Sequence, residues 1–443
     1  MFQRNALGYL RAWRKKEHRK PLVLRGARLV GKTTVTESFA KDYPYYVYLN
    51  LEKEADRMLF DPAMDIKRTM ENISYNRHTP LNENTLLFID EIQNSATAVQ
   101  YLRYFYEQYP KLSVVAAGSL LENYADRKFS FPVGRVEYMA MRPCTFYEYL
   151  AATGNEEDLQ LLQANKGHFI HDRLMQAFNR YTLLGGMPEV IQTYIDTGDL
   201  RATEPIYASL LASYSDDVEK YAVSRTQAAV IRHILQYGWS QAGEIITYER
   251  FAGSNYKSRE VSEAFLTLQK SMLLETVYPT TSVELPALPV MSHHPKLLWI
   301  DTGIVNYSAG IRDELFNARN IQDVYRGRIA EHIAGQELAG QSVRTDFRRC
   351  FWQKSGKSEA EVDYLYAADG KLIPVEVKSG VNARLKSLQQ FMSLSPQNVA
   401  VRIWSKPYET DDTTSPINGK AFRLINLPFY MVGMMNEIIR QHL

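Results

Sequence analysis

Glu376 and Lys378 stand two residues apart in KLIPVEVKSG (371–380), a segment that alternates apolar and polar residues. In a β-strand, residues i and i+2 point to the same face, so the carboxylate and the ammonium group lie side by side. Such a pair has two interpretations, an ion pair on the surface of a strand or part of a site that binds Mg²⁺ and activates water. The choice depends on which other acidic residues accompany the pair.

Two further carboxylates are candidates for the same site. Glu331 falls in VYRGRIAEHIAGQEL (324–338), whose apolar residues recur at the spacing of an amphipathic helix. Asp363 falls in EAEVDYLYA (359–367), a predicted strand that the turn ADGK separates from the Glu376 strand. A second helical segment, ARLKSLQQFMSL, follows the lysine. The chain therefore runs helix, strand, acid-x-lysine strand and helix.

The residue types in this order suit metal chemistry. Asp363 and Glu376 offer hard oxygen ligands to Mg²⁺, and Glu331 would complete the metal shell. A metal-bound water has a lowered pKa and becomes a nucleophile at neutral pH, and Lys378 would orient it. The arrangement resembles the PD-(D/E)XK nuclease core, and the resemblance implies metal-dependent DNA cleavage. A domain of this fold that has lost cleavage, and an ordinary ion-paired strand, are the alternatives.

A second group of residues has the spacing of a phosphate-binding loop. LVLRGARLVGKTT (22–34) places an apolar strand before a loop that matches G-x-x-x-x-G-K-[ST]. The glycines let backbone N–H groups face a phosphate chain at the N-terminus of the next helix. Lys32 would reach the β- and γ-phosphates, and Thr33 would offer its hydroxyl to Mg²⁺; a glycine-rich turn with a surface lysine is the alternative. The expected nucleotide-binding residues are Gly26, Ala27, Arg28, Val30, Gly31, Lys32, Thr33 and Thr34.

An apolar strand that ends in two acids supplies the other half of a nucleotide site. In TLLFIDEIQ (85–93) the run from Leu86 to Ile89 is continuously apolar, as in a strand buried on both faces. Asp90 would hold the Mg²⁺ shell, and Glu91 would polarise the attacking water. The alternative is that the two acids only cap the N-terminus of a helix. The P-loop upstream makes this alternative the less favoured of the two. Because the sequence has no N-K-x-D motif for guanine, ATP with Mg²⁺ is the expected cofactor pair.

Two more segments complete the pattern. LSVVAAGS (112–119) predicts a strand ending at Ser119, placed to hydrogen-bond the γ-phosphate or the water, and FPVGRVEYMAMRP puts Arg135 in a tight loop. The order of segments resembles the AAA+ class, and more closely a family of prokaryotic AAA-like ATPases. In that family a C-terminal domain of unknown function follows, which resembles the PD-(D/E)XK nuclease fold. Leu29 departs from the glutamine expected there.

The resemblance implies roles for two of these residues. Ser119 would act as a sensor of the nucleotide, and Arg135 as an arginine finger that reaches the site of a neighbouring subunit. A homo-oligomer is therefore the expected assembly. A structural arginine bound to a local carboxylate is the alternative for Arg135.

The residues between the two sites predict a helical region. The pattern is helical from about 145 to 240, and LLGGMPEVI (183–191) is a helix stop and turn with a structural role. Residues 241–280 suggest helix, turn, helix and strand, the order of a winged helix; an interdomain packing module is the alternative. The residues expected near DNA, at the start of the second helix, are Tyr256, Lys257 and Arg259.

Composition limits the remaining choices. The 443 residues exceed one ordinary domain, and 45% hydrophobic with 23% charged residues is typical of a soluble globular protein. A net charge of +2 means that any DNA contact depends on local patches. The two distant cysteines fit a reducing compartment, and the sequence shows neither a signal core nor a membrane-length apolar run. A cytoplasmic protein without membrane contact is expected.

These observations predict an α/β protein of three parts. Residues 1–150 would form an AAA-like P-loop ATPase domain, 151–290 a helical lid and winged-helix region, and 291–443 a restriction-endonuclease-like, PD-(D/E)XK domain. The expected function is Mg-ATP hydrolysis coupled to DNA engagement, with DNA cleavage by the last domain. The alternative is a nucleotide-switched module that binds nucleic acid or protein without cleaving it.

Overall fold

The computed structural model describes residues 4–118, 132, 134–164, 166–218, 222–311, 327–355, 360–378 and 385–443. They form two units that are described separately below. Unit 1 comprises Met1–Arg142, Lys270–Leu273 and Ser342–Asp346. Unit 2 comprises Pro143–Gln269, Leu274–Gln341 and Phe347–Leu443. No helix among the described residues is both long enough and apolar enough to cross a membrane.

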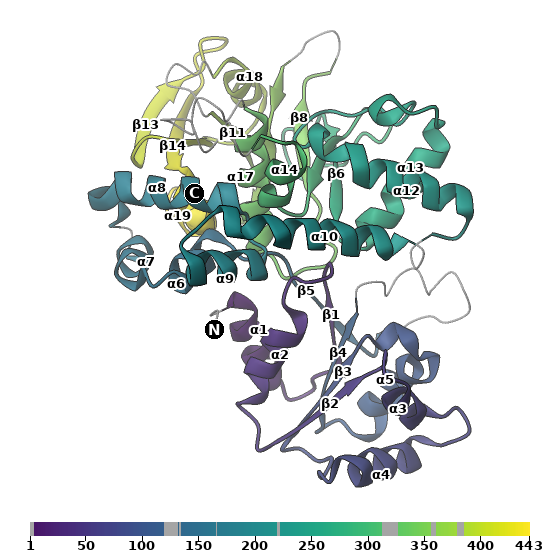
Figure 1. Cartoon of the computed structure of the whole chain (residues 1–443). Helices are drawn as coiled ribbons and strands as arrows, with labels where there is room; N and C mark the ends of the chain where they lie inside the picture. The colour runs from purple at the N-terminus through teal and green to yellow at the C-terminus, as the bar shows by residue number, and fades with distance from the viewer. Residues whose placement is uncertain are drawn as a thin grey trace. The chain divides into compact units, whose positions relative to one another are not determined.

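Unit 1 is built on a five-stranded parallel sheet with the strand order β2-β3-β4-β1-β5 (Figure 1). Its strands are β1 (Leu22–Arg25), β2 (Tyr45–Asn50), β3 (Thr85–Asp90), β4 (Ser113–Gly118) and β5 (Glu137–Ala140). Every residue of β3 and β4 is buried, which is why their sequences are apolar without alternation. The three strands expected from the sequence in this region are confirmed.

Helices cover both faces of this sheet (Figure 1). The unit contains α1 (Asn5–Arg14), α2 (Lys32–Ala40), α3 (Glu54–Arg57), α4 (Ile66–Arg77) and α5 (Ala96–Gln108). Apolar residues of α4 and α5, such as Ile73 and Leu102, form one core with Leu87 and Ile89 of β3. On the other face α2 contacts β3 and β4 and packs against α1. The parallel strands end at one edge, where α/β proteins bind ligands, so this sheet brings the P-loop and the acid strand together.

The first half of unit 2 is helical, as expected. It contains α6 (Phe146–Ala152), α7 (Glu156–Gln163), α8 (His171–Leu184), α9 (Pro188–Thr197), α10 (Glu204–Asp216), α12 (Arg225–Tyr237) and α13 (Ser258–Lys270). Gly185 ends α8 with a φ of 69°, and the N–H of Gly186 donates to Asp301 Oδ2 at 2.5 Å. A side chain at Gly185 would collide with that aspartate, so the two glycines have the structural role that was predicted.

One expected helix is absent. Residues 242–250 contain no helix, and the next helical segment is the short 3₁₀ helix Phe251–Gly253. Gly243, Arg250 and Ala252 have φ values of 76°, 54° and 49°, and a right-handed helix cannot pass through such left-handed residues. The expected second helix is present as α13, with α12 as its nearest preceding helix. The winged-helix assignment stays a prediction.

The second half of unit 2 contains two sheets. The order β7-β6-β8-β9 joins β6 (Leu274–Thr280), β7 (Lys296–Trp299), β8 (Cys350–Gln353) and β9 (Glu361–Val362). The order β10-β11-β12-β14-β13 joins β10 (Tyr364–Ala368), β11 (Lys371–Val377), β12 (Val399–Trp404), β14 (Ala421–Pro428) and β13 (Glu409–Thr414). The helices are α14 (Thr302–Ser308), α17 (Arg328–Gly340), α18 (Lys386–Leu394) and α19 (Met435–Gln441). Because β6 pairs with β7, one sheet spans the domain boundary expected at 290.

Most elements expected around the acid-x-lysine pair are present, but the single strand expected over 359–367 is interrupted. Asp363 lies at a bend between β9 and β10, which belong to different sheets. Glu331 lies on α17, and Glu376 lies on β11, which α18 follows. β10 and β11 form a hairpin whose turn residues, Asp369 and Gly370, have φ values of 44° and 75°. Two residues with positive φ match the twist of a tight antiparallel hairpin, as the ADGK segment predicted.

Candidate nucleotide site and carboxylate cluster

The glycines of the P-loop are required by its geometry. Gly31 precedes α2 with a φ of 93°, in the left-handed region that favours glycine. A Cβ at Gly26 would lie 2.5 Å from the carbonyl oxygen of Met141, too close for any side chain. Leu29, which replaces the expected glutamine, has a φ of 66° and an exposed side chain. The loop therefore has the curled backbone that the motif predicts.

Lys32 lies inside this curled loop. Its buried Nζ donates to the carbonyl oxygens of Gly26 and Ala27, each at 2.9 Å. The ammonium group is thus held within the loop, at the N-terminus of α2 where an anion is favoured. Of the other expected binding residues, Val30 is buried and Thr34 is exposed.

Thr33 and Asp90 meet at the mouth of the loop. Thr33 Oγ1 donates to Asp90 Oδ2 at 2.8 Å, although the two residues are 57 positions apart. Tyr48 also donates to that oxygen, at 3.3 Å, and the N–H of Glu91 donates to Asp90 Oδ1 at 3.0 Å. A hydroxyl and a carboxylate oxygen so close together are the donor set that holds Mg²⁺ in P-loop enzymes. The residues fit the expected ion.

Glu91 follows Asp90 with a φ of 52°, which turns its side chain out of the strand direction. Burial raises the pKa of its carboxyl, Lys32 opposes that rise, and Asp90 adds to it. Gln93 donates through Nε2 to Glu91 Oε2. A half-buried carboxylate with a raised pKa, oriented by an amide, suits a group that polarises water. Tyr48 and Gln93 were not predicted because each contacts the acids only after the chain has folded.

Arg135 forms an ion pair within its own unit. Its Nε contacts Glu107 Oε1 of α5 at 3.0 Å, and its side chain is 44% exposed. This is the arrangement of the structural alternative, and an exposed guanidinium still leaves the arginine finger as a prediction. Ser119 lies outside the described residues, and β4 leads to it at Gly118.

Arg4 is a residue of the loop region that sequence reasoning missed. Its guanidinium donates to the carbonyl oxygens of Val30, at 3.0 Å, and Arg142, at 2.6 Å. These hydrogen bonds fix the backbone of the P-loop at Val30. Arg4 could not be predicted because it is not part of the P-loop sequence motif.

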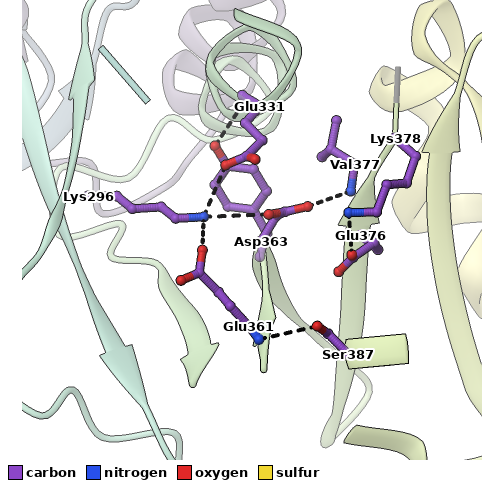
Figure 2. A network of polar contacts seen from close by, with 9 residues as sticks. Lys296, Glu331, Glu361, Asp363, Glu376, Val377, Lys378 and Ser387 are labelled. Carbon is purple, nitrogen blue, oxygen red and sulfur yellow. Dashed lines mark hydrogen bonds and ion pairs between the residues drawn. The ribbon is translucent and has the colours of Figure 1, made fainter. Parts of the chain in front are cut away.

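The acid-x-lysine pair lies as predicted. Lys378 Nζ contacts Glu376 Oε1 at 2.6 Å (Figure 2). The glutamate is not on the surface, since its side chain is only 4% exposed. Its second oxygen, Oε2, is buried and has no hydrogen-bond partner among the residues that the structure describes. An orphaned carboxylate oxygen in the protein interior is costly, and a bound cation would relieve that cost.

Asp363 joins the pair through the backbone of β11. Its Oδ2 accepts a hydrogen bond from the N–H of Val377 at 2.7 Å (Figure 2). Val377 lies between Glu376 and Lys378, so the aspartate is fixed beside both of them. The structure thus brings Asp363, Glu376 and Lys378 together.

The cluster contains a cation that sequence reasoning missed, Lys296. Its Nζ lies 3.0 Å from Glu331 Oε2 and 3.5 Å from Asp363 Oδ1, and it also pairs with Glu361. Figure 2 shows this ammonium group between the three carboxylates. The sequence feature that could have indicated its role is a lysine at the start of an otherwise apolar segment, Lys296–Trp299. This segment is β7, and all its residues are buried.

The charges of the cluster perturb one another. Burial and the neighbouring Asp363 raise the pKa of Glu331 to about 8 and that of Glu376 to about 7. Burial disfavours the charged form of Lys296, but Asp363, Glu331 and Glu361 outweigh burial and raise the pKa of its ammonium group. The pKa values of both glutamates are thus raised mainly by burial and secondly by Asp363, and the adjacent lysines only partly oppose the rise.

His332 positions the helix that carries Glu331. Its Nε2 accepts a hydrogen bond from the N–H of Trp299 at 2.9 Å, and its Nδ1 lies 3.0 Å from Thr302 Oγ1. Burial lowers the pKa of the imidazole to about 3, so it is neutral. Because Trp299 ends the strand that Lys296 begins, this contact fixes Glu331 relative to the lysine.

Oxygen donors of this kind suit Mg²⁺ or Mn²⁺. Among the residues that the structure describes, however, no three acidic, histidine or cysteine side chains are arranged to hold a metal ion. Asp363, Glu376 and Glu331 each face a lysine ammonium group, but only Glu376 also has a buried oxygen without a partner among the described residues. Glu376 with the adjacent Asp363 therefore fits a two-carboxylate site better than Glu331 does. Glu331 as a metal ligand stays a prediction.

The residues expected near DNA surround the start of α13. Tyr256 and Lys257 precede the helix, which begins at Ser258. Arg259, in its first turn, is paired with Glu263 at 2.9 Å and remains highly exposed. Lys257 and Arg259 are exposed, which permits contact with phosphates, whereas Tyr256 is half-buried.

Three family models match separate parts of the chain. An AAA domain matches residues 18–150, and two domains of unknown function, DUF8612 and DUF4143, match residues 175–315 and 326–427. The N-terminal part is therefore an AAA-type, P-loop ATPase-like domain. No curated protein matches the chain.

Solved structures of low similarity also match. The Walker-type ATPase PABY2304 of Pyrococcus abyssi is 12% identical, with a TM-score of 0.41 over 70% of this chain and 96% of that one. The Aeropyrum pernix Orc1 protein, solved in complex with DNA, is 13% identical, with a TM-score of 0.28 over 70% of this chain and 93% of that one.

Proposed function

We propose that this protein hydrolyses ATP with Mg²⁺ and couples hydrolysis to the engagement of DNA. The observation that supports the first part most strongly is the 2.8 Å contact between Thr33 and Asp90 at the mouth of the P-loop. That contact joins the two halves of the motif, which a chance glycine-rich turn would leave apart. The AAA match over residues 18–150 supports the same assignment.

The roles of the residues follow from their positions. Backbone N–H groups of residues 26–34 would bind the phosphate chain, and Lys32 would exchange its contacts with two loop carbonyls for contacts with the β- and γ-phosphates. Thr33 and Asp90 would hold Mg²⁺, whose charge offsets that of the phosphates. Glu91 would orient the water and accept its proton.

ATP hydrolysis by Lys32→Ala protein tests this assignment. We expect Lys32→Ala to lose hydrolysis and to bind ATP weakly, because the charge that faces the β- and γ-phosphates is removed. The matched control is Lys53→Ala, which deletes an exposed lysine of the same unit. Hydrolysis by Lys32→Ala at the rate of the control would rule out the P-loop as the active site.

DNA engagement is the second part of the proposal. It is supported by exposed Lys257 and Arg259 at the start of α13, where a winged helix would present its recognition helix. Stimulation of ATP hydrolysis by double-stranded DNA, and its loss in Lys257→Ala/Arg259→Ala protein, is the expected result. Unchanged DNA binding by that variant would favour the interdomain packing module.

Metal-dependent DNA cleavage is a second candidate function. The observation that favours it is the buried, unpartnered Oε2 of Glu376 beside Asp363 and Lys378. Asp363 and Glu376 would hold the ion, and Lys378 would orient the attacking water. We expect nicking of plasmid DNA in Mn²⁺ or Mg²⁺ that Glu376→Gln abolishes. If the pure wild-type protein leaves plasmid intact, the non-cleaving, nucleotide-switched binding module is the better account.

A further inference from the structure

The carboxylate cluster already contains a cation supplied by the chain. Lys296 Nζ has Glu331 Oε2 at 3.0 Å, Asp363 Oδ1 at 3.5 Å and a carboxylate oxygen of Glu361 in closer contact. Only 6% of the lysine side chain is exposed, so water does not screen these contacts. The ammonium group thus supplies, from the chain itself, a positive charge that offsets the three carboxylates.

The other end of the cluster is electrostatically incomplete. Within the described part of the chain, Glu376 Oε2 is buried without a partner, while Oε1 of the same side chain faces Lys378. With all groups ionised, the four carboxylates Glu331, Glu361, Asp363 and Glu376 outnumber the two ammonium groups, Lys296 and Lys378, by two charges. One of these two excess negative charges lies with Lys296, Glu331 and Glu361. The other lies with Lys378, Asp363 and Glu376, beside the oxygen that has no partner among the described residues (Figure 2).

We propose that Lys296 is a fixed cation that divides the cluster: Glu331 and Glu361 are its counter-ions, and only Asp363 and Glu376 remain to bind one divalent ion. Lys296 and that ion then share Asp363, whose Oδ1 faces the lysine. The lysine limits the site to a single ion and weakens its binding, because a positive charge stands beside it. The inference rests on the proposed metal site and changes its ligand set, since Glu331 is removed from it.

The test is calorimetric titration of the full chain with Mn²⁺ in the absence of nucleotide. An Asp90→Asn background removes the carboxylate of the P-loop site. We expect wild-type Lys296 protein to bind one Mn²⁺ and Lys296→Met to bind it at least about tenfold more tightly, because a neighbouring charge is lost. Lys371→Met, which deletes a lysine at the start of the same strand as Glu376, is the control and should leave the affinity unchanged.

Substitutions of the carboxylates test the ligand set without touching the lysine. Glu376→Gln should abolish Mn²⁺ binding, whereas Glu361→Gln should change the affinity by less than about threefold, since it is a counter-ion and not a ligand. Glu361 is partly exposed, so this variant is expected to fold even if Lys296→Met does not. A tenfold loss of affinity in Glu361→Gln would overturn the proposal.

The outcomes separate this proposal from the proposed metal site. Glu376-dependent binding that Lys296→Met leaves unchanged would overturn the role of Lys296 while the metal site stands. Binding by Lys296→Met alone would support the role of Lys296 and contradict metal-dependent cleavage by the natural protein. No Mn²⁺ heat in any variant would overturn both.

Discussion

At the scale of single residues, the two sites use charge in opposite ways. Lys32 is held by two backbone carbonyls, which a phosphate could replace, whereas Lys296 is already paired with carboxylates. Thr33 Oγ1 donates a hydrogen bond to Asp90 Oδ2 at the edge where the strands of the sheet end. The first arrangement is suited to a ligand that comes and goes, and the second to a fixed charge distribution.

Arg135 provides a prediction at this scale. If it is an arginine finger acting on a neighbouring subunit, Arg135→Ala should lower turnover by on the order of 10³-fold, and mixing it with Lys32→Ala subunits should restore part of the activity. Glu107→Gln is the matched control, because it breaks the ion pair of Arg135 but keeps the arginine. Equal losses in Arg135→Ala and Glu107→Gln, with no recovery on mixing, would show that Arg135 is structural.

Glu337 provides a pH-dependent prediction. Burial raises the pKa of its carboxyl to about 7 in the folded protein, from 4.5 as the ordinary value. The folded chain thus keeps a proton that the unfolded chain loses, so the stabilisation is full below about pH 4.5 and is lost as pH rises toward 7. A difference of this size corresponds to roughly 3 kcal/mol.

Urea unfolding of wild-type and Glu337→Gln protein between these pH values checks the assignment. The amide keeps the contacts with Tyr181 Oη, at 2.6 Å, and the N–H of Phe146, at 3.1 Å, within reach but cannot ionise. The free energy of unfolding should therefore fall less steeply with pH in the variant. Parallel curves would mean that Glu337 does not carry the pH dependence.

At the scale of elements, local patterns predicted well and long-range contacts did not. Local sequence patterns predicted four elements correctly, namely β1, β3, the P-loop and the hairpin turn at Asp369. Burial on both faces requires a run of apolar residues, and a positive φ favours glycine or aspartate, so both features can be recognised from neighbouring residues. A helix was wrongly predicted in residues 242–250 because the segment contains apolar residues, which pack there without a helical backbone. Lys296 is 35 residues from Glu331 and 67 from Asp363, and no spacing rule spans such separations.

The contact between α14 and the glycine turn after α8 gives a prediction for an element. A Cβ at Gly303 would collide with the carbonyl oxygen of Leu184, and both are backbone-fixed. Gly303→Ala should therefore cost about 1–3 kcal/mol of unfolding free energy. Gly8→Ala, inside α1 where a Cβ has open space, is the control and should leave stability unchanged or raise it by up to about 1 kcal/mol. Equal stability of the two variants would contradict the packing described here.

At the scale of the whole molecule, the two sites belong to separate units. The P-loop, Asp90 and Glu91 lie in unit 1, and every residue of the carboxylate cluster lies in unit 2. Separate placement predicts that Asp363→Asn removes Mn²⁺ binding at the cluster, and any DNA cleavage, while basal ATP hydrolysis stays within about twofold of wild type. A loss of basal hydrolysis as large as that of Lys32→Ala would contradict independent sites.

The central claim is that Glu91 activates water for ATP hydrolysis beside a Thr33–Asp90 pair that holds Mg²⁺. The direct test measures ATP binding and ATP hydrolysis in the same preparation of Glu91→Gln protein, with Glu71→Gln, an exposed glutamate of unit 1, as control. The account predicts ATP affinity near that of the wild type and turnover lowered by about 10²-fold or more, because a general base is removed without a change in shape. Normal turnover in Glu91→Gln would contradict it.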